Sequence, residues 1–314
     1  MKMINTLTLN PAVDKILHLE ALQKNTTNRV LRTDTAVGGK GTHVSMNLRL
    51  MGRASRAFGL AGGAGGRYVI DSLTRWGVEP HFIYNPGWES RTNYLLVEED
   101  GQCTLIAEKG ESPPEKDIAA LIKKMESLIG PGETLVLSGD ISNCPDPLIY
   151  NRMLAALREK ELKVVLDAGG ETLREALAWP PYLIKPNLDE LSALLGRTLR
   201  SVDDVVEAVQ ELSRYQIEII AVTLGSAGAV LRTEAGIYQA TPPAIKVKNT
   251  IGCGDSFLAG LLHGLAESWP LERALQWATA VSAASAESAL SVGFEAGRAE
   301  ALMQHVKAKK ILGA

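Results

Sequence analysis

The run at residues 249–256 contains the residue types that phosphate chemistry needs. Gly252 and Gly254 flank Cys253, Asp255 follows, and an apolar, helix-like pattern begins immediately afterwards. Such a turn leaves backbone N–H groups unpaired at the positive end of a helix, where an anion such as phosphate binds. A carboxylate beside that anion suits a base that takes a proton from an attacking hydroxyl. A plain glycine turn with Asp255 as an N-cap fits the same residues, so the run alone leaves both interpretations open.

A second glycine cluster, at residues 38–41, can bring backbone close to a ligand just before a helix. Lys40 within it offers a mobile positive charge, although a strand-to-helix turn with a solvated lysine fits equally well. The cluster is not a Walker A motif, because Lys40 is followed by glycine and the upstream spacing differs. No Gly-x-Gly-x-x-Gly follows a strand, so a dinucleotide site is not supported.

Two further motifs follow expected strands. Asn187 and Glu190 are three residues apart after a strand, so both can face one way and organise Mg²⁺ through water. The pair also fits a capping box, and both interpretations can hold together. Residues 223–228 end another strand and offer hydroxyls and bare backbone to a nucleotide phosphate.

The composition excludes several functional classes. The 314 residues are 46% hydrophobic and 22% charged, with a net charge of −3, which gives no support for a nucleic-acid or membrane-surface role. Three widely spaced cysteines form no disulfide framework, and the five histidines never fall at metal-ligand spacing. The N-terminus is too short and polar for a signal peptide, and no apolar run reaches transmembrane length. These features predict a cytoplasmic protein.

Short apolar strands alternate with helices, which predicts an α/β fold with a mostly parallel sheet covered by helices on both faces. Strands are expected at 3–9, 54–60, 133–138, 162–167, 182–185 and 217–223, and helices at 41–51, 66–76, 147–160, 171–178, 187–195 and 202–214. Residues 14–35 and 90–107 break this rhythm, and the second of these segments is expected to form a hairpin. The two segments predict either a small antiparallel sheet that covers the active site or ordinary edge strands.

Five motifs in this order resemble the phosphofructokinase B branch of the ribokinase-like carbohydrate kinases. They are Thr8-Leu9-Asn10-Pro11-x-x-Asp14, Gly38-Gly39-Lys40-Gly41, Lys185-Pro186-Asn187-x-x-Glu190, Thr223-Leu224-Gly225-x-x-Gly228 and Gly252-Cys253-Gly254-Asp255. The resemblance implies a ribokinase-like, Rossmann-type core from residues 1–13, 36–89 and 108–314. It also implies a β-sheet lid from residues 14–35 and 90–107, through which two chains form a homodimer. The opening motif narrows the resemblance to hexose-phosphate kinases, which use ATP and Mg²⁺.

The resemblance also implies residue roles. Asp255 is expected to be the catalytic base, with the backbone of Gly252, Cys253 and Gly254 as the anion hole. The residues expected around ATP are Lys185, Asn187, Glu190, Thr223, Gly225 and Gly228, with Asn187 and Glu190 holding Mg²⁺ through water. The residues expected around the sugar phosphate are Asp14, Arg29, Gly39, Lys40, His43, Arg91 and Asp140, where the two arginines clamp its phosphate.

Two positions depart from the family pattern. His43 stands where the family usually has asparagine, and its imidazole is expected still to donate one hydrogen bond to the sugar. Asp140 interrupts the usual Ser-Gly-Ser-Leu-Pro stretch and brings negative charge towards the phosphosugar unless a cation compensates. Residues 27–30 and 108–110 look closest to tagatose-6-phosphate kinases, and nearly as close to 1-phosphofructokinases.

The family leaves three candidate substrates: tagatose 6-phosphate, fructose 1-phosphate and fructose 6-phosphate. Two alternatives stay open, namely a family kinase for another sugar and a sugar-phosphate-binding protein without turnover. The retained Asp255, Asn187 and Glu190 speak against the second alternative, because a binding protein needs no base.

Overall fold

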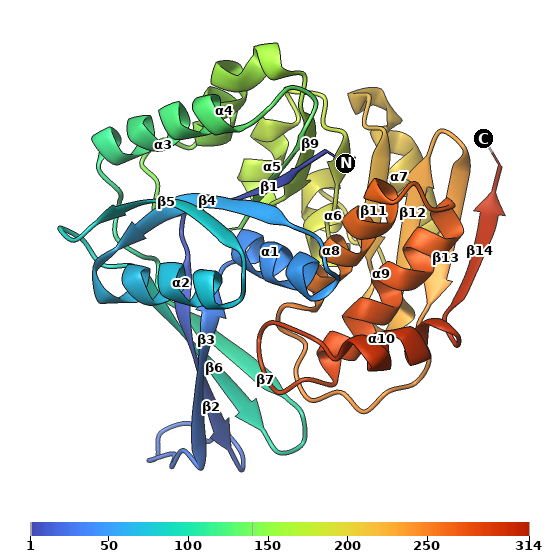
Figure 1. Ribbon diagram of the computed structural model, residues 1–314. Coiled ribbons are helices and arrows are strands. Elements are labelled where there is room, and N and C mark those ends of the chain that lie inside the picture. Colours follow the sequence, from blue (N-terminus) through green and yellow to red (C-terminus); the bar gives the residue numbers. More distant parts are fainter. Residues whose placement is uncertain (1, 140, 314) are drawn as a thin grey trace.

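The computed structural model describes residues 2–139 and 141–313, so Asp140 lies outside the described residues. Ten strands form the main sheet, in the order β14-β13-β12-β11-β10-β9-β8-β1-β4-β5 (Figure 1). Their bounds are β1 Ile4–Thr8, β4 Ser55–Gly62, β5 Glu79–Asn85, β8 Thr134–Ser138, β9 Lys163–Asp167, β10 Leu183–Ile184, β11 Ile219–Thr223, β12 Ala229–Thr233, β13 Gly236–Thr241 and β14 Lys307–Leu312. Strands β11, β10, β9, β8, β1, β4 and β5 pair in parallel, and β12, β13 and β14 extend the sheet antiparallel. The predicted mostly parallel α/β fold is confirmed.

Helices cover both faces of this sheet. They are α1 Lys40–Leu50, α2 Gly63–Arg75, α3 Glu115–Leu128, α4 Ile149–Leu157, α5 Gly170–Ala176, α6 Leu188–Leu195, α7 Val202–Glu211, α8 Cys253–Ala266, α9 Leu271–Ala286 and α10 Ala296–Met303. Alternate residues of one strand pack on opposite faces: in β8, Leu135 and Leu137 face the helices α3 to α7, whereas Val136 faces α1, α8 and α9. This alternation makes two cores, one on each side of the sheet.

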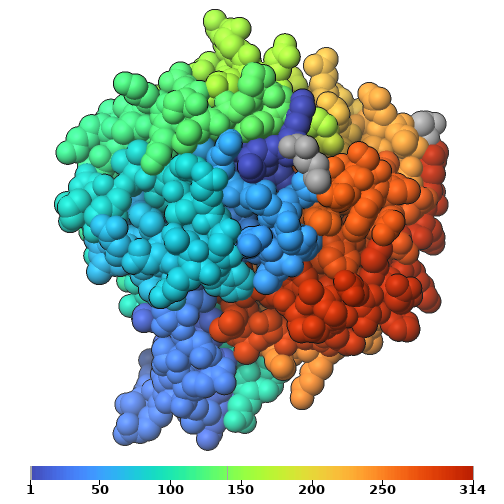
Figure 2. All heavy atoms as spheres, viewed as in Figure 1, coloured from blue at the N-terminus to red at the C-terminus, as the bar shows by residue number. Residues whose placement is uncertain are grey.

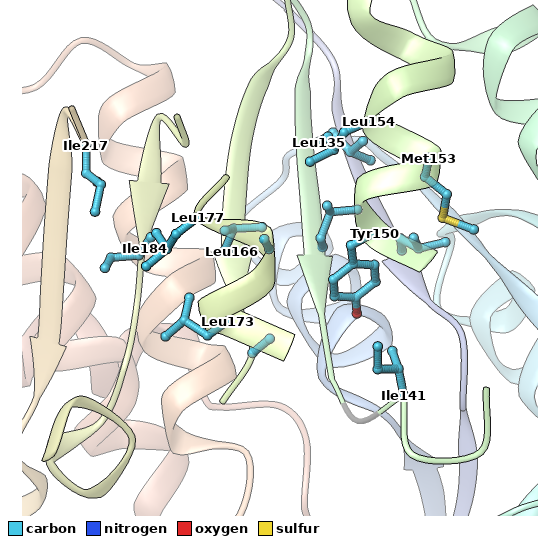
Figure 3. Close-up of a cluster of buried hydrophobic side chains, with 14 of the residues drawn as sticks. Leu135, Ile141, Tyr150, Met153, Leu154, Leu166, Leu173, Leu177, Ile184 and Ile217 are labelled. Atoms are coloured by element: carbon cyan, nitrogen blue, oxygen red, sulfur yellow. The ribbon is translucent and has the colours of Figure 1, made fainter. Parts of the chain in front are cut away.

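The first core is shown in Figure 3, where Leu135 and Leu166 from the sheet meet Tyr150 and Met153 of α4 and Leu173 of α5. All five side chains are buried. This packing anchors the strands whose carboxyl ends carry the polar residues described below.

A second, four-stranded sheet has the order β3-β2-β6-β7, with β2 Ala12–Leu19, β3 Arg32–Gly38, β6 Arg91–Glu98 and β7 Cys103–Ala107. It stands out from the main body at the lower left of Figures 1 and 2. The hairpin predicted within residues 90–107 is confirmed as β6 and β7. The expectation of an antiparallel sheet is wrong, because β2 and β6 pair in parallel and the sheet is therefore mixed.

Across residues 2–139 and 141–313, the structure contains no helix with the length and apolar character that a bilayer crossing requires.

Replacing Leu135 by alanine tests the first core. This leucine has no exposed surface, so Leu135→Ala is expected to lower the free energy of unfolding by about 2–5 kcal/mol through lost burial and a cavity. Leu148→Ala is the matched control, because Leu148 is 45% exposed and its truncation is expected to change stability by less than about 0.5 kcal/mol. Urea unfolding followed by circular dichroism measures both. Equal effects of the two substitutions would contradict the assignment of the core.

Candidate active site

A cavity of about 1130 Å³ lies between the carboxyl edge of the main sheet and the small sheet. Thr8 at the end of β1, Lys185 directly after β10 and Thr223 at the end of β11 line it from one side. Asn93 and Leu95 of β6 line it from the small sheet. Open α/β sheets bind ligands at this edge, and the volume is ample for a nucleotide with a small second substrate.

Most of the residues singled out from the sequence line this cavity. They are Asp14, Gly39, Lys40, His43, Arg91, Lys185, Asn187, Glu190, Thr223, Gly225, Gly228, Gly252, Cys253, Gly254 and Asp255. Arg29 does not, because it is exposed in the loop between β2 and β3, away from the cavity of its own chain. The role of Arg29 as a phosphate clamp therefore stays a prediction, and Asp140 lies outside the described residues.

The N-terminus of α8 forms one wall of the cavity. Gly252 is its N-cap at φ 79°, and a Cβ there would lie 1.9 Å from the carbonyl oxygen of Ser291, so only glycine fits. The N–H groups of Gly254 and Asp255 have no acceptor among the described residues. Burial and the nearby charge of Asp255 outweigh the lowering effect of the Ser285 hydrogen bond and raise the pKa of Cys253 to about 12, so its thiol stays neutral beside an incoming anion. These groups make a candidate anion site with the Asp255 carboxylate at its edge.

His43 is bonded through both ring nitrogens. Nδ1 lies 2.8 Å from Oδ2 of Asp255 and Nε2 lies 2.7 Å from the carbonyl oxygen of Val37. Burial is the largest single influence on the pKa of His43 and lowers it. The hydrogen bond and charge of Asp255, with Asp14 and the Val37 carbonyl, outweigh burial and raise that pKa above its usual 6.5. Because the protein itself occupies both nitrogens, the hydrogen bond from His43 to the sugar that the sequence predicts has no free ring N–H in this structure.

A cluster of charged groups adjoins the anion site. The ammonium groups of Lys40 and Lys185 lie 3.2 and 3.1 Å from Oδ1 of Asp167, which is fully buried, and Lys40 also lies 3.4 Å from Glu190. Burial lowers the pKa of Lys40, but Asp167, Glu190 and Asp255 outweigh it and raise that pKa well above its usual value. For Asp167, burial raises the pKa but Lys185 and Lys40 outweigh it and lower it. Lys40 and Asp167 are therefore both charged at neutral pH.

Asp167 was missed from the sequence. The sequence feature that could have indicated it is an acidic residue at the carboxyl end of the mostly apolar strand β9. Open α/β sheets bind their ligands at the carboxyl ends of their strands. No short motif surrounds it, so its importance became visible only when β9 and β10 were placed side by side.

Asn187 and Glu190 form the capping box that the sequence allowed. The Glu190 N–H donates to Oδ1 of Asn187 at 2.7 Å, and the Asn187 N–H donates to Oε2 of Glu190 at 2.9 Å. Both residues also line the cavity. The box fixes their direction, which is compatible with a second role towards a ligand.

Asp14, on strand β2 of the small sheet, lines the other end of the cavity. The amide of Asn93 donates to its Oδ1 at 2.9 Å, and a Cβ on Gly38 would lie 2.1 Å from the same oxygen. Asn93, which the sequence reasoning did not single out, therefore orients the carboxylate. Arg91 lines the same region and donates through Nη1 to the carbonyl oxygen of Glu108 at 3.0 Å.

The two glycines of the 223–228 motif have different roles. Gly225 has φ 57° and open space where a Cβ would project, so its backbone is free to approach a ligand. A Cβ on Gly228, at φ 93°, would lie 1.9 Å from the carbonyl oxygen of Ala240, so this glycine serves packing. Beyond them the cavity wall is largely apolar and includes Pro242, Pro243, Ile245, Val247 and Ala286.

Comparison with known proteins identifies the family. The model of the pfkB family carbohydrate kinases matches residues 7–293. The chain belongs to the pfkB family of carbohydrate kinases. A 1-phosphofructokinase of Bacillus subtilis strain 168 is 34% identical over 286 residues, which cover 91% of this chain and 93% of the relative.

Solved structures of phosphofructokinases have the same fold as this chain. Phosphofructokinase-2 from Escherichia coli in complex with fructose 6-phosphate has a TM-score of 0.88 at 26% identity, over 97% of this chain and 99% of that chain. A tetrameric inhibited form of the same enzyme has a TM-score of 0.87 at 26% identity, over the same 97% and 99%. This chain is thus an ATP-dependent sugar kinase of the phosphofructokinase type.

Replacing Asp167 by asparagine tests the charged cluster. Two ammonium groups would lose their buried counter-charge, so Asp167→Asn is expected to lower the free energy of unfolding by about 3–5 kcal/mol. Asp71→Asn, an exposed change on α2, is the control and is expected to shift stability by less than about 0.5 kcal/mol. Urea unfolding near pH 7 measures both. A loss for Asp167→Asn no larger than that of the control would show that the cluster does not stabilise the fold.

Proposed function

We propose that this kinase transfers the γ-phosphoryl group of ATP to the free primary hydroxyl of a ketohexose phosphate, with Asp255 as the base and fructose 1-phosphate as the first substrate candidate. The observation that carries the proposal is the place of Asp255, nine per cent exposed in its side chain, beside unpaired N–H groups of α8. A base and an anion site therefore adjoin in one cavity.

The chemistry needs few groups from the protein. As the sugar oxygen attacks the γ-phosphorus, a new O–P bond forms and the bond to the bridging oxygen breaks, leaving its electron pair on ADP. The hydroxyl proton passes to Asp255. The N–H groups of Gly254 and Asp255, with the ammonium groups of Lys40 and Lys185, offset the negative charge of the phosphates.

The sugar would lie between Asp14 and Asp255. Asp14 and Asn93 supply acceptors and donors for ring hydroxyls, and Arg91 supplies a guanidinium for the phosphate already present. A ketofuranose has a CH₂O group at each end of its ring, so one cavity can receive it in either direction. The 34% identical 1-phosphofructokinase supports fructose 1-phosphate. Fructose 6-phosphate, bound to the E. coli enzyme, and tagatose 6-phosphate, favoured by residues 27–30 and 108–110, are the other candidates.

Magnesium would accompany ATP in this family, and the residues present fit it. Glu190 and Asn187 offer hard oxygen ligands at the cavity wall, while residues 2–139 and 141–313 contain no cluster of three His, Cys, Asp or Glu side chains that could cage a metal. Mg²⁺ commonly keeps several waters and binds through one or two carboxylates and the substrate phosphates. Glu190 and Asn187 would thus hold the hydrated ion, which supplies charge neutralisation on ATP.

We further propose that the small sheet acts as a lid and joins two chains into a homodimer. Leu105 of β7 lines the cavity although it is 49% exposed, and Ile106 beside it is 54% exposed. Such apolar exposure on one sheet supports a partner surface. The division into a core of 1–13, 36–89 and 108–314 and a lid of 14–35 and 90–107 belongs to this proposal. So does a cytoplasmic location, which the three free cysteines support.

Replacing Asp255 by asparagine tests the base. Asp255→Asn is expected to lower kcat by about 10²-fold to 10⁴-fold, because the proton acceptor is lost, with little change in the KM for ATP. Asp189→Asn is the matched control, an exposed acid in the first turn of α6 outside the cavity lining, and is expected to leave kcat unchanged. Coupled ADP release over a panel of phosphosugars and free sugars measures both.

The panel also decides between the alternatives. ADP release with fructose 1-phosphate supports the proposal, whereas release only with another sugar assigns a different substrate. Binding of phosphosugars without any ADP release would favour a binding protein without turnover. A kcat for Asp255→Asn within about threefold of the wild type would contradict the base assignment.

A further inference from the structure

The protons between His43 and Asp255 can be counted from their partners. The carbonyl oxygen of Val37 only accepts hydrogen bonds, so Nε2 of His43, 2.7 Å away, carries a proton. An ionised carboxylate also only accepts, so the 2.8 Å contact between Nδ1 and Oδ2 of Asp255 needs a second proton. His43 and Asp255 together therefore form a neutral, doubly hydrogen-bonded imidazolium–carboxylate pair.

We propose that protonated His43 is a positioning residue for the base: its Nδ1–H holds Oδ2 of Asp255 and leaves Oδ1 for the sugar hydroxyl, so turnover is lost when His43 loses that proton. The inference rests on the proposed role of Asp255. It gives His43 a different task from the sugar contact expected from the sequence, since neither nitrogen is free for the substrate.

The surroundings favour the charged imidazole. His43 is 3% exposed, and Oδ2 of Asp14 on β2 lies 3.9 Å from its Nε2. Lys40, one turn before it on α1, interacts electrostatically with Asp255. Lys185 approaches from the end of β10, with its Nζ 3.3 Å from where a Cβ on Gly254 would lie. Two carboxylates thus directly flank the imidazole, while both lysines are also engaged with Asp167, in agreement with the raised pKa of His43.

The proton balance of turnover follows from this pair. The hydroxyl proton passes to Oδ1 of Asp255 as the O–P bond forms, and it leaves to solvent after the products, while His43 keeps both of its protons throughout. When His43 is neutral, the Nδ1 lone pair faces an oxygen that also only accepts. The resulting repulsion turns the carboxylate away from the hydroxyl.

Three proteins compared across pH test the proposal. The wild type is expected to lose kcat about tenfold or more on the alkaline side, with a midpoint above 6.5 at the pKa of His43. His43→Asn keeps an N–H donor where Nδ1 lies but cannot ionise, so its kcat is expected to stay within about threefold of the wild type at pH 7 without the alkaline loss. His43→Leu keeps the bulk without a donor and is expected to lose kcat about tenfold or more at every pH, with the KM for ATP unchanged. The same alkaline loss in His43→Asn, or an unchanged kcat in His43→Leu, would overturn the proposal.

A readout independent of turnover separates this inference from the proposed function. An NMR titration of ¹⁵N-labelled imidazole is expected to place the pKa of His43 above 6.5 in the wild type and to lower it in Asp255→Asn, where the charge partner is gone. The stability given by the pair is fully present below pH 6.5 and is lost as the pH rises through the folded pKa of His43. The melting temperature of the wild type is therefore expected to fall over that interval, and that of His43→Asn to show no such fall.

The two measurements fail in different ways. If no sugar supports ADP release but His43 titrates above 6.5, the proposed function fails while the pair stands. If ADP is released but His43 titrates at or below 6.5, the pair is overturned while the kinase stands.

Discussion

The cavity depends on how the buried carboxylate of Asp255 is stabilised at the positive end of α8. Asp255 would be costly to bury alone, but the helix terminus, the imidazole of His43 and the ammonium of Lys40 compensate its charge. Those three partners come from α8 and α1, whose shared packing against the main sheet fixes their spacing. The position of the proposed base is therefore a consequence of how one face of the sheet is covered.

The alternation of strands and helices was predictable because it is written in local periodicity, and the motifs after β10 and β11 were predictable because ligands meet the carboxyl ends of parallel strands. The parallel pairing of β2 with β6 was not, since it joins segments about 80 residues apart in sequence. Asp167 had no motif of its own, and the two hydrogen bonds of His43 depend on α8 lying against α1. Local sequence patterns predict the helices, the strands and most candidate site residues. Contacts between residues far apart in the sequence are seen only in the three-dimensional structure.

The two ends of the cavity divide the work of a phosphoryl transfer. In the proposed complex, the N-terminus of α8, the ammonium groups of Lys40 and Lys185 and the capping box of α6 would face the nucleotide, where negative charge has to be offset. Asp14, Asn93 and Arg91, which lie on strands β2 and β6 of the small sheet, would face the phosphosugar in the same complex. His43, which stands where the family usually has asparagine, lies between the proposed nucleotide and sugar sides of the cavity. There it changes the surroundings of the proposed base, Asp255, rather than the shape of the proposed sugar site.

The central claim is that Asp255 directs a phosphoryl group from ATP onto a phosphosugar. A ³¹P NMR spectrum of the protein with Mg-ATP and fructose 1-phosphate tests it most directly, because it shows where the phosphorus goes. We expect ADP and a second sugar phosphomonoester signal to grow in equal amounts, and neither to grow at a comparable rate with Asp255→Asn. Growth of inorganic phosphate with ADP, or equal bisphosphate formation by both proteins, would contradict the account.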